Sequence, residues 1–224
     1  MRRLASCVVW GALSLACLPV WAANHGPKTY GTISYLHLGK LLPGSAPAPP
    51  LPQIDFHNFT FYLYPTQTDP DLSRAGIPPI SADAVAPLVA PVANGIYKRH
   101  NDTADPFEFD VIKVEQASLP HAPGKQAAIV FGIFYAGSGT PVCTGVVQVL
   151  ARREGRIEIE DQITFDCRGG MNAQYIPAKR RLHIVSAVFA AGDPRCCPSM
   201  SDTVNFKLEG DRAKASVVAL SSSE

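Results

Sequence analysis

Apolar residues recur along the chain from Lys28 onward, in short runs that alternate with polar residues or are apolar throughout. The runs end at Gly, Pro, Asn or Asp, which are the residues that favour turns. Side chains on a strand point alternately to the two faces of a sheet, so a two-residue period predicts strands and little helix. We therefore expect a mainly β protein, an antiparallel meander with a sandwich-like or barrel-like core.

The individual runs differ in the burial that they predict. Three of them alternate and are typical of half-buried strands: "TYGTISYLHL" (29–38), "NFTFYLYP" (58–65) and "PFEFDVIKVE" (106–115). In the second run Phe59, Phe61 and Leu63 share a face. The run "QAAIVFGIFY" (126–135) is apolar on both faces, which predicts a central strand covered on both sides.

The clearest pairing information lies between residues 142 and 167, where "REGR" (153–156) separates two strand-like runs and predicts a hairpin. We expect one shared face for Val147, Val149 and Ala151, and one for Ile157, Ile159, Ile163 and Phe165. With Gly155 near the centre of the turn, Cys143 and Cys167 lie equally far from it on the same face. The pattern favours a cross-strand disulfide between them, and two buried thiols are the alternative.

The C-terminal third predicts a second hairpin. "RRLHIVSAVFAA" (180–191) and "DTVNFKLEGD" (202–211) flank a cysteine-containing loop, and "KASVVALS" (214–221) is expected to form a last edge strand.

The N-terminus has the pattern of a secretory signal peptide. Arg2 and Arg3 precede an apolar run that is too short for a transmembrane helix, and small residues predict cleavage between Ala22 and Ala23. The alternative is a lipid anchor at Cys17, which ends the lipobox-like "SLAC". We therefore expect a signal peptide (1–22), a proline-rich segment (23–53) and one β-rich domain (54–224) without a transmembrane span, located in the periplasm or secreted. The proline-rich first half disfavours long helices and central strands.

Charge and motifs narrow the function. The 20 Lys and Arg residues nearly balance the 19 Asp and Glu residues and are spread along the chain, which argues against nucleic-acid binding. The six histidines show no metal-site spacing, and the hydrolase elbow, the zinc-protease helix and the calcium loop are all missing from the sequence. The sequence therefore predicts no catalytic residues, no metal and no cofactor, and it favours a protein that is not an enzyme.

Four cysteines follow the predicted signal peptide, and two of them are adjacent in "DPRCCPSM" (193–200). Export places them where disulfides persist. Cys196 and Cys197 could bond to each other, bond outward to Cys143 and Cys167, or bind a soft metal as thiolates. The candidate interaction loop around them consists of Asp193, Pro194, Arg195, Pro198 and Ser199.

Several strings carry a resemblance: "IDFHNFTF" (54–61), the Asn94-Gly95 pair near Tyr97, a continuous apolar strand, and "GDPRCCPSM" (192–200). Together they resemble the LppP/LprE-type lipoproteins of the bacterial envelope, over about residues 54 to 208. The resemblance implies an exported or lipid-anchored β-rich domain without an assigned activity, and it favours a bond between the two adjacent cysteines. Its first motif corresponds here to Asp55, Phe56, Asn58, Phe59 and Thr60. This chain lacks the acidic turn of many such proteins, since it has "HAPGKQ" (121–126) there.

We therefore expect an exported envelope protein that serves as a non-catalytic, disulfide-stabilised binding or structural module. Its partner would be an envelope protein, a glycan or a small ligand. The alternative is a periplasmic thiol-redox or soft-metal protein that uses Cys196 and Cys197.

Overall fold

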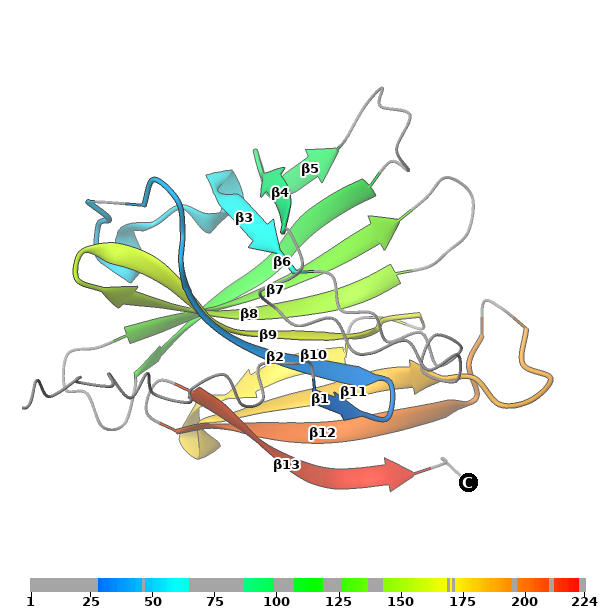
Figure 1. Ribbon diagram of the computed structural model, residues 1–224. Coiled ribbons are helices and arrows are strands. Elements are labelled where there is room, and N and C mark those ends of the chain that lie inside the picture. Colours follow the sequence, from blue (N-terminus) through cyan, green and yellow to red (C-terminus); the bar gives the residue numbers. More distant parts are fainter. Residues whose placement is uncertain are drawn as a thin grey trace, which may run out of the picture.

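A computed structural model describes residues 28–45, 47–64, 87–98, 107–118, 126–136, 143–168, 170, 172–194, 197–209 and 212–221. These residues form strands and three single-turn 3-10 helices, and every strand pair is antiparallel (Figure 1). The mainly β fold predicted from the sequence is confirmed. The predicted signal peptide, its predicted cleavage site and the alternative lipid-anchor residue Cys17 lie outside the described residues, as do Arg195 and Cys196.

The largest sheet has seven strands in the order β1-β2-β9-β8-β7-β6-β5. They are β1 (Lys28–Tyr30), β2 (Ile33–Leu41), β5 (Ile96–Lys98), β6 (Phe107–Ser118), β7 (Gln126–Ala136), β8 (Cys143–Arg153) and β9 (Arg156–Asp166). Strands β5 to β9 form a meander, and the β1–β2 hairpin pairs with the far edge of β9. Strands β1 and β2, which lie within the proline-rich segment, thus form one edge of this sheet.

Two smaller sheets complete the fold. The C-terminal sheet has the order β10-β11-β12-β13, and β3 pairs with β4 in a two-stranded sheet. The strands are β3 (Thr60–Leu63), β4 (Leu88–Pro91), β10 (Asn172–Ile176), β11 (Arg181–Val188), β12 (Met200–Glu209) and β13 (Arg212–Ser221), and the 3-10 helices are η1 (Leu51–Gln53), η2 (Phe56–Asn58) and η3 (Pro177–Lys179). Figure 1 shows the C-terminal sheet beneath the large sheet and the β3–β4 pair above it.

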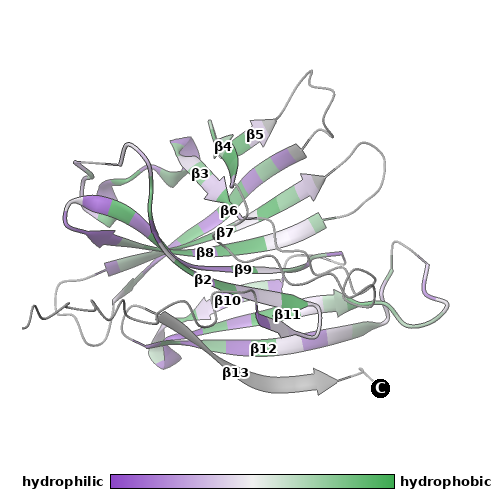
Figure 2. Cartoon of the chain, viewed as in Figure 1, coloured by the Kyte–Doolittle hydropathy of each residue, from purple (hydrophilic) through white to green (hydrophobic). Residues whose placement is uncertain are grey.

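The large sheet is buried on both faces because a separate hydrophobic core lies on each side of it. On β7, Ala128 and Val130 join the core under β3 and β4, whereas Ile129 and Phe131 join the core above the C-terminal sheet. The central strand predicted from residues 126–135 is therefore confirmed. Figure 2 shows apolar residues along the middle strands of this sheet and polar residues at the tip of the β8–β9 hairpin. Full burial of an aliphatic or phenyl side chain contributes about 1.5–3 kcal/mol, so the two faces dominate the stability.

The β8–β9 hairpin turns at Glu154 and Gly155, whose φ angles are 49° and 74°. Two consecutive residues with positive φ form the turn that matches the twist of paired strands, and Arg153 pairs with Arg156 across it. Farther along the hairpin the register shifts between Val149 and Leu150, so Glu160 is an extra residue on β9.

The extra residue corrects one prediction. Ile157 and Ile159 belong to the core under β3 and β4, whereas Ile163 and Phe165 belong to the core above the C-terminal sheet. The prediction that these four residues share one face is wrong, because the bulge at Glu160 moves the alternation along by one residue.

The same bulge places the two hairpin cysteines opposite each other. Continuation of the register from the turn would set Asp166 opposite Cys143, but the shift pairs Asp166 with Thr144 instead. Cys143 and Cys167 form a disulfide, and the Cys167 N–H donates to the Cys143 carbonyl at 3.2 Å. The disulfide predicted from the sequence is confirmed.

The second predicted hairpin is formed by β11 and β12, which pair from Arg181 with Lys207 to Val188 with Met200. Their inward-facing residues, including Ile184 and Phe206, fill the core against the large sheet. The expected last strand is β13, at one edge of the C-terminal sheet.

Candidate functional site

The motif at Asp55 forms a capped turn. The Asp55 carboxylate is at the N-cap of η2, where it accepts from the His57 N–H at 3.0 Å and from the Asn58 side-chain amide. The Asn58 hydrogen bond is the largest cause of a lowered pKa for Asp55, and the His57 N–H adds to it. Asp55 is therefore ionised at neutral pH.

This turn binds the Asn94-Gly95 turn that precedes β5. The Asn58 side-chain oxygen accepts from the Asn94 N–H at 2.9 Å, and the His57 carbonyl accepts from the Gly95 N–H at 2.7 Å. Asn94 and Gly95 have φ angles of 55° and 84°, which Asn and Gly tolerate best. Two strings of the proposed resemblance are thus in direct contact.

A surface pocket of about 340 Å³ lies beside the Asp55 turn. Its polar lining is Ser45, Gln53, Asp55 and Asn58, and its apolar lining includes Ile54, Phe59 and Ile157. The lining also includes Gly44, Pro47, Ala48 and Pro49, and this part of the lining is attached to the β8–β9 hairpin, since the Ala48 N–H donates to the Gly155 carbonyl at 2.6 Å. The pocket therefore combines a carboxylate, two amides, a hydroxyl and a phenyl ring.

The structure separates the five motif residues by role. Asp55, Asn58 and Phe59 line the pocket, whereas Phe56 is buried in the core under β3 and β4, and Thr60 is exposed at the start of β3. Phe56 and Phe61 pack edge-on against Phe59, with ring centres 5.2 and 5.0 Å from it, and so hold its ring in place.

The other predicted loop joins β11 to β12 and lies in a different layer from the Asp55 turn (Figure 1). One Asp193 carboxylate oxygen accepts from the Ala190 N–H at 2.7 Å, the Ser199 N–H at 2.8 Å and the Ser199 hydroxyl at 3.0 Å. These bonds lower the pKa of Asp193, that from the Ser199 N–H most of all. Asp193 and Ser199 thus close the base of the loop, and Pro194 and Pro198 lie between them.

Cys197 is exposed and disulfide-bonded, and its partner lies outside the described residues. The Cys197 N–H donates to the Pro194 carbonyl at 3.0 Å. The bond between Cys143 and Cys167 excludes the outward pairing of the two adjacent cysteines with these residues.

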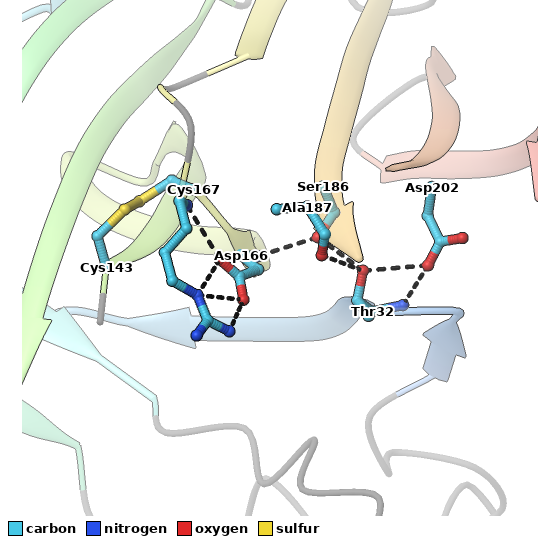
Figure 3. Close-up of polar contacts among 8 residues, drawn as sticks. Thr32, Cys143, Asp166, Cys167, Ser186, Ala187 and Asp202 are labelled. Atoms are coloured by element: carbon cyan, nitrogen blue, oxygen red, sulfur yellow. Dashed lines mark hydrogen bonds and ion pairs between the residues drawn. A yellow bond between two sulfur atoms is a disulfide. The ribbon is translucent and has the colours of Figure 1, made fainter. Parts of the chain in front are cut away.

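A polar cluster joins the large sheet to the C-terminal sheet next to the Cys143–Cys167 disulfide (Figure 3). Asp202 accepts from the Thr32 N–H at 2.7 Å, and the Thr32 hydroxyl lies 2.7 Å from the Ser186 hydroxyl oxygen. Ser186 in turn accepts from the Asp166 N–H at 3.0 Å. Ser186 is completely buried, and its hydroxyl contacts Thr32 and the Asp166 backbone amide, so this cluster holds the sheets together.

A second polar cluster lies on β9 and was not predicted from the sequence. Asp161 is fully buried and accepts from the Tyr35 hydroxyl at 2.7 Å, and it lies 2.9 Å from His37 Nδ1. Glu158 and Glu160 are also buried, and Arg153 forms ion pairs with both. The two ion pairs with Arg153 compensate the burial of Glu158 and Glu160, and the hydrogen bond from Tyr35 compensates that of Asp161.

Membrane-spanning helices and metal-binding clusters are both absent from the described residues. None of their helices is long and apolar enough to span a bilayer, and no three of their His, Cys, Asp or Glu side chains are arranged to hold a metal ion.

No protein-family model, curated protein or solved structure shows a significant match to the chain.

Proposed function

We propose that the protein is an exported, non-catalytic binding module of the bacterial envelope, and that the pocket at the Asp55 turn holds its ligand. The Cys143–Cys167 disulfide supports an extracytoplasmic location, because disulfides persist mainly in oxidising compartments. The observation that carries the proposal is the pocket itself, whose volume lies in the range of small-ligand sites.

Among the three partner classes, the lining chemistry favours a glycan. The Asp55 carboxylate and the Gln53 and Asn58 amides can bind sugar hydroxyls, and the Phe59 ring offers an apolar surface for a pyranose face. The described lining has no Lys or Arg, so it favours a neutral ligand over an anionic one.

The test is calorimetric titration of the mature protein with neutral mono- and oligosaccharides. Gln53→Ala should weaken binding by about tenfold, because one hydrogen bond to a neutral group contributes about 0.5–1.5 kcal/mol. Gln116→Ala is the matched control, since Gln116 is exposed on β6 and does not line the pocket. Absence of binding to every sugar, or an equal loss in both variants, would contradict the glycan proposal.

The exposed, disulfide-bonded Cys197 favours one alternative, a thiol-redox role or soft-metal binding after reduction. We propose that the partner of Cys197 is the adjacent Cys196. A bond between them closes a small ring and leaves neither residue as a free thiol. Thiol counts before and after mild reduction, together with copper and zinc analysis, separate the two functions. Two easily reduced thiols or bound metal would support the alternative.

We also propose cleavage between Ala22 and Ala23, which leaves a mature protein that begins at Ala23. The mass of the mature N-terminal peptide tests this directly. A diacylated Cys17 peptide from membranes would instead establish the lipid anchor.

A further inference from the structure

Basic residues gather at one end of the C-terminal sheet, where η3 leads into β11. Lys179 is the last residue of η3, Arg180 follows it, and Arg181 begins β11. Lys207 on β12 is the cross-strand partner of Arg181. The Leu208 N–H donates to the Arg180 carbonyl at 2.9 Å, which attaches this turn to β12. We call the four residues Lys179, Arg180, Arg181 and Lys207 the basic patch.

The basic patch lies on the outer surface of the C-terminal sheet. Leu182 and Phe206 are buried in the core against the large sheet. Side chains alternate along a strand, so the neighbouring Arg181 and Lys207 point away from that core. Arg181 is half-buried, and the other three residues of the patch are exposed. The patch is therefore accessible to a partner.

The charge of the basic patch is poorly compensated. Lys207 lies 2.9 Å from the Glu209 carboxylate, but both side chains are exposed, and exposed ion pairs contribute little. Glu209 is the one acidic residue among the outward positions of β10, β11 and β12. Within the described part of the chain the other three residues of the patch form no ion pair, and Arg181 Nε is buried without a hydrogen-bond partner.

The register of the sheet brings cations together. Arg181 and Lys207 are directly opposite each other, and Lys214 is the next residue across, on β13. Like charges at opposite positions of paired strands are destabilising. Lysine often protects an edge strand from association, but β11 and β12 are interior strands, so edge protection does not explain Arg181 or Lys207. An anionic partner that neutralises the repulsion does explain this row.

We propose that the basic patch binds the surface of an anionic lipid bilayer. The negative potential of such a surface attracts each Lys or Arg near it. The patch consists of a sheet face and the turn at its end, which suits a flat charged surface. The proposal does not depend on the pocket at the Asp55 turn, which shares no residue with the patch and lies in a different layer (Figure 1).

The experiment sediments the mature protein with vesicles of phosphatidylcholine alone and with vesicles in which phosphatidylglycerol replaces part of the phosphatidylcholine. We expect binding to the anionic vesicles only, and we expect it to weaken as salt is added, because salt screens exposed charges. Absence of binding to anionic vesicles, or equal binding to both kinds, would overturn the proposal. Retention on heparin without vesicle binding would overturn it too, since the partner would then be a soluble polyanion.

Charge-removing variants locate the site. Lys179→Gln and Lys207→Gln should each weaken binding to anionic vesicles by about fivefold, and the double variant by about twenty-fivefold. Both residues are exposed, so the variants should keep the fold, which circular dichroism checks. Unchanged vesicle binding by the folded double variant would refute the assignment to this patch.

Arg181→Gln has a matched control in Arg156→Gln. Both arginines are half-buried and have a buried Nε without a hydrogen-bond partner in the described residues, but Arg156 lies at the turn of the β8–β9 hairpin. We expect Arg181→Gln to weaken vesicle binding by about fivefold and Arg156→Gln to leave it unchanged. An equal loss in both variants would show that net charge, and not the basic patch, determines binding.

Discussion

Two carboxylates organise the turns that carry the predicted motifs. Asp55 caps η2 and Asp193 closes the β11–β12 loop, and each accepts hydrogen bonds from backbone N–H groups of its own turn. Both carboxylates have a lowered pKa because hydrogen bonds favour the charged form: the Asn58 side-chain amide has the largest effect on Asp55, and the Ser199 N–H has the largest effect on Asp193. The loops are therefore ordered by local hydrogen bonds as well as by the cores.

The Asp193 loop should loosen in acid. A pKa below the ordinary value of 3.8 means that the carboxylate stabilises the folded loop above that pH, and that the contribution is lost as the pH falls through the lowered pKa. We expect the Ser199 and Ala190 amide resonances to shift together in NMR spectra, with a midpoint below 3.8. Asp193→Asn is the control, because it has no titrating group. A midpoint above 3.8 would contradict the hydrogen bonding described for this loop.

The sequence predicted part of the Asp55 site and missed the rest for a physical reason. Asp55, Asn58 and Phe59 were identified as a motif, but their role depends on the pocket that they share with Ser45 and Ala48 and on the hydrogen bond from Asn94, which is distant in sequence. The buried amides of Gln148 and Gln162 left no sequence signal, because both residues are ordinary polar positions in alternating strands. Only the packing of β3 against the large sheet reveals that they are buried.

Among the elements, the β8–β9 hairpin shows where pattern reasoning succeeds and fails. The turn residues and the apolar alternation predicted the hairpin and its disulfide correctly. The bulge at Glu160 could not be predicted, because a charged residue between two isoleucine-containing runs fits an unbroken strand equally well. The cysteines were placed opposite by counting from Gly155, whereas the structure reaches the same pairing through a two-residue turn and one extra residue on β9.

The β1–β2 turn should tolerate no side chain at Gly31. A Cβ there would overlap the Asp202 carboxylate, which accepts from the Thr32 N–H and connects β12 to the large sheet. Gly31 also has a φ of 60°, so Ala adds backbone strain of about 1–2 kcal/mol. With the lost charged hydrogen bond we expect Gly31→Ala to lower the free energy of unfolding by about 3 kcal/mol, measured by urea denaturation.

Gly44→Ala provides the matched control for that change. Gly44 has a φ of 66°, but a Cβ there meets no atom within 4 Å. The control should therefore show the backbone strain alone, about 1–2 kcal/mol. Equal losses in the two variants would show that Asp202 does not restrain the turn.

At the scale of the whole molecule, three layers share one central sheet. The core above the C-terminal sheet includes Cys167, and the Arg168 guanidinium lies 3.9 Å from the centre of the Phe189 ring at the start of the cysteine loop. The contact between Arg168 and Phe189 thus joins the hairpin disulfide to the Asp193 loop, although the two features are separate in the sequence. Loss of the disulfide should consequently affect the contact between the two layers.

The two cysteine pairs should differ in their effect on global stability. The Cys143–Cys167 bond joins residues that are 24 positions apart, and the chain-entropy model gives about 3.5 kcal/mol for a loop of that length. Its loss also leaves Cys167, which is 2% exposed, as an unbonded thiol in the core.

A bond between Cys196 and Cys197, which we propose, closes almost no loop, and Asp193 already holds the base of that segment. We therefore expect Cys143→Ser to lower the melting temperature by many degrees and Cys196→Ser to change it little, in calorimetric scans of oxidised protein with alkylated free thiols. Equal destabilisation by both substitutions would show that the adjacent cysteines belong to the framework of the fold, and would remove the support for a locally closed loop.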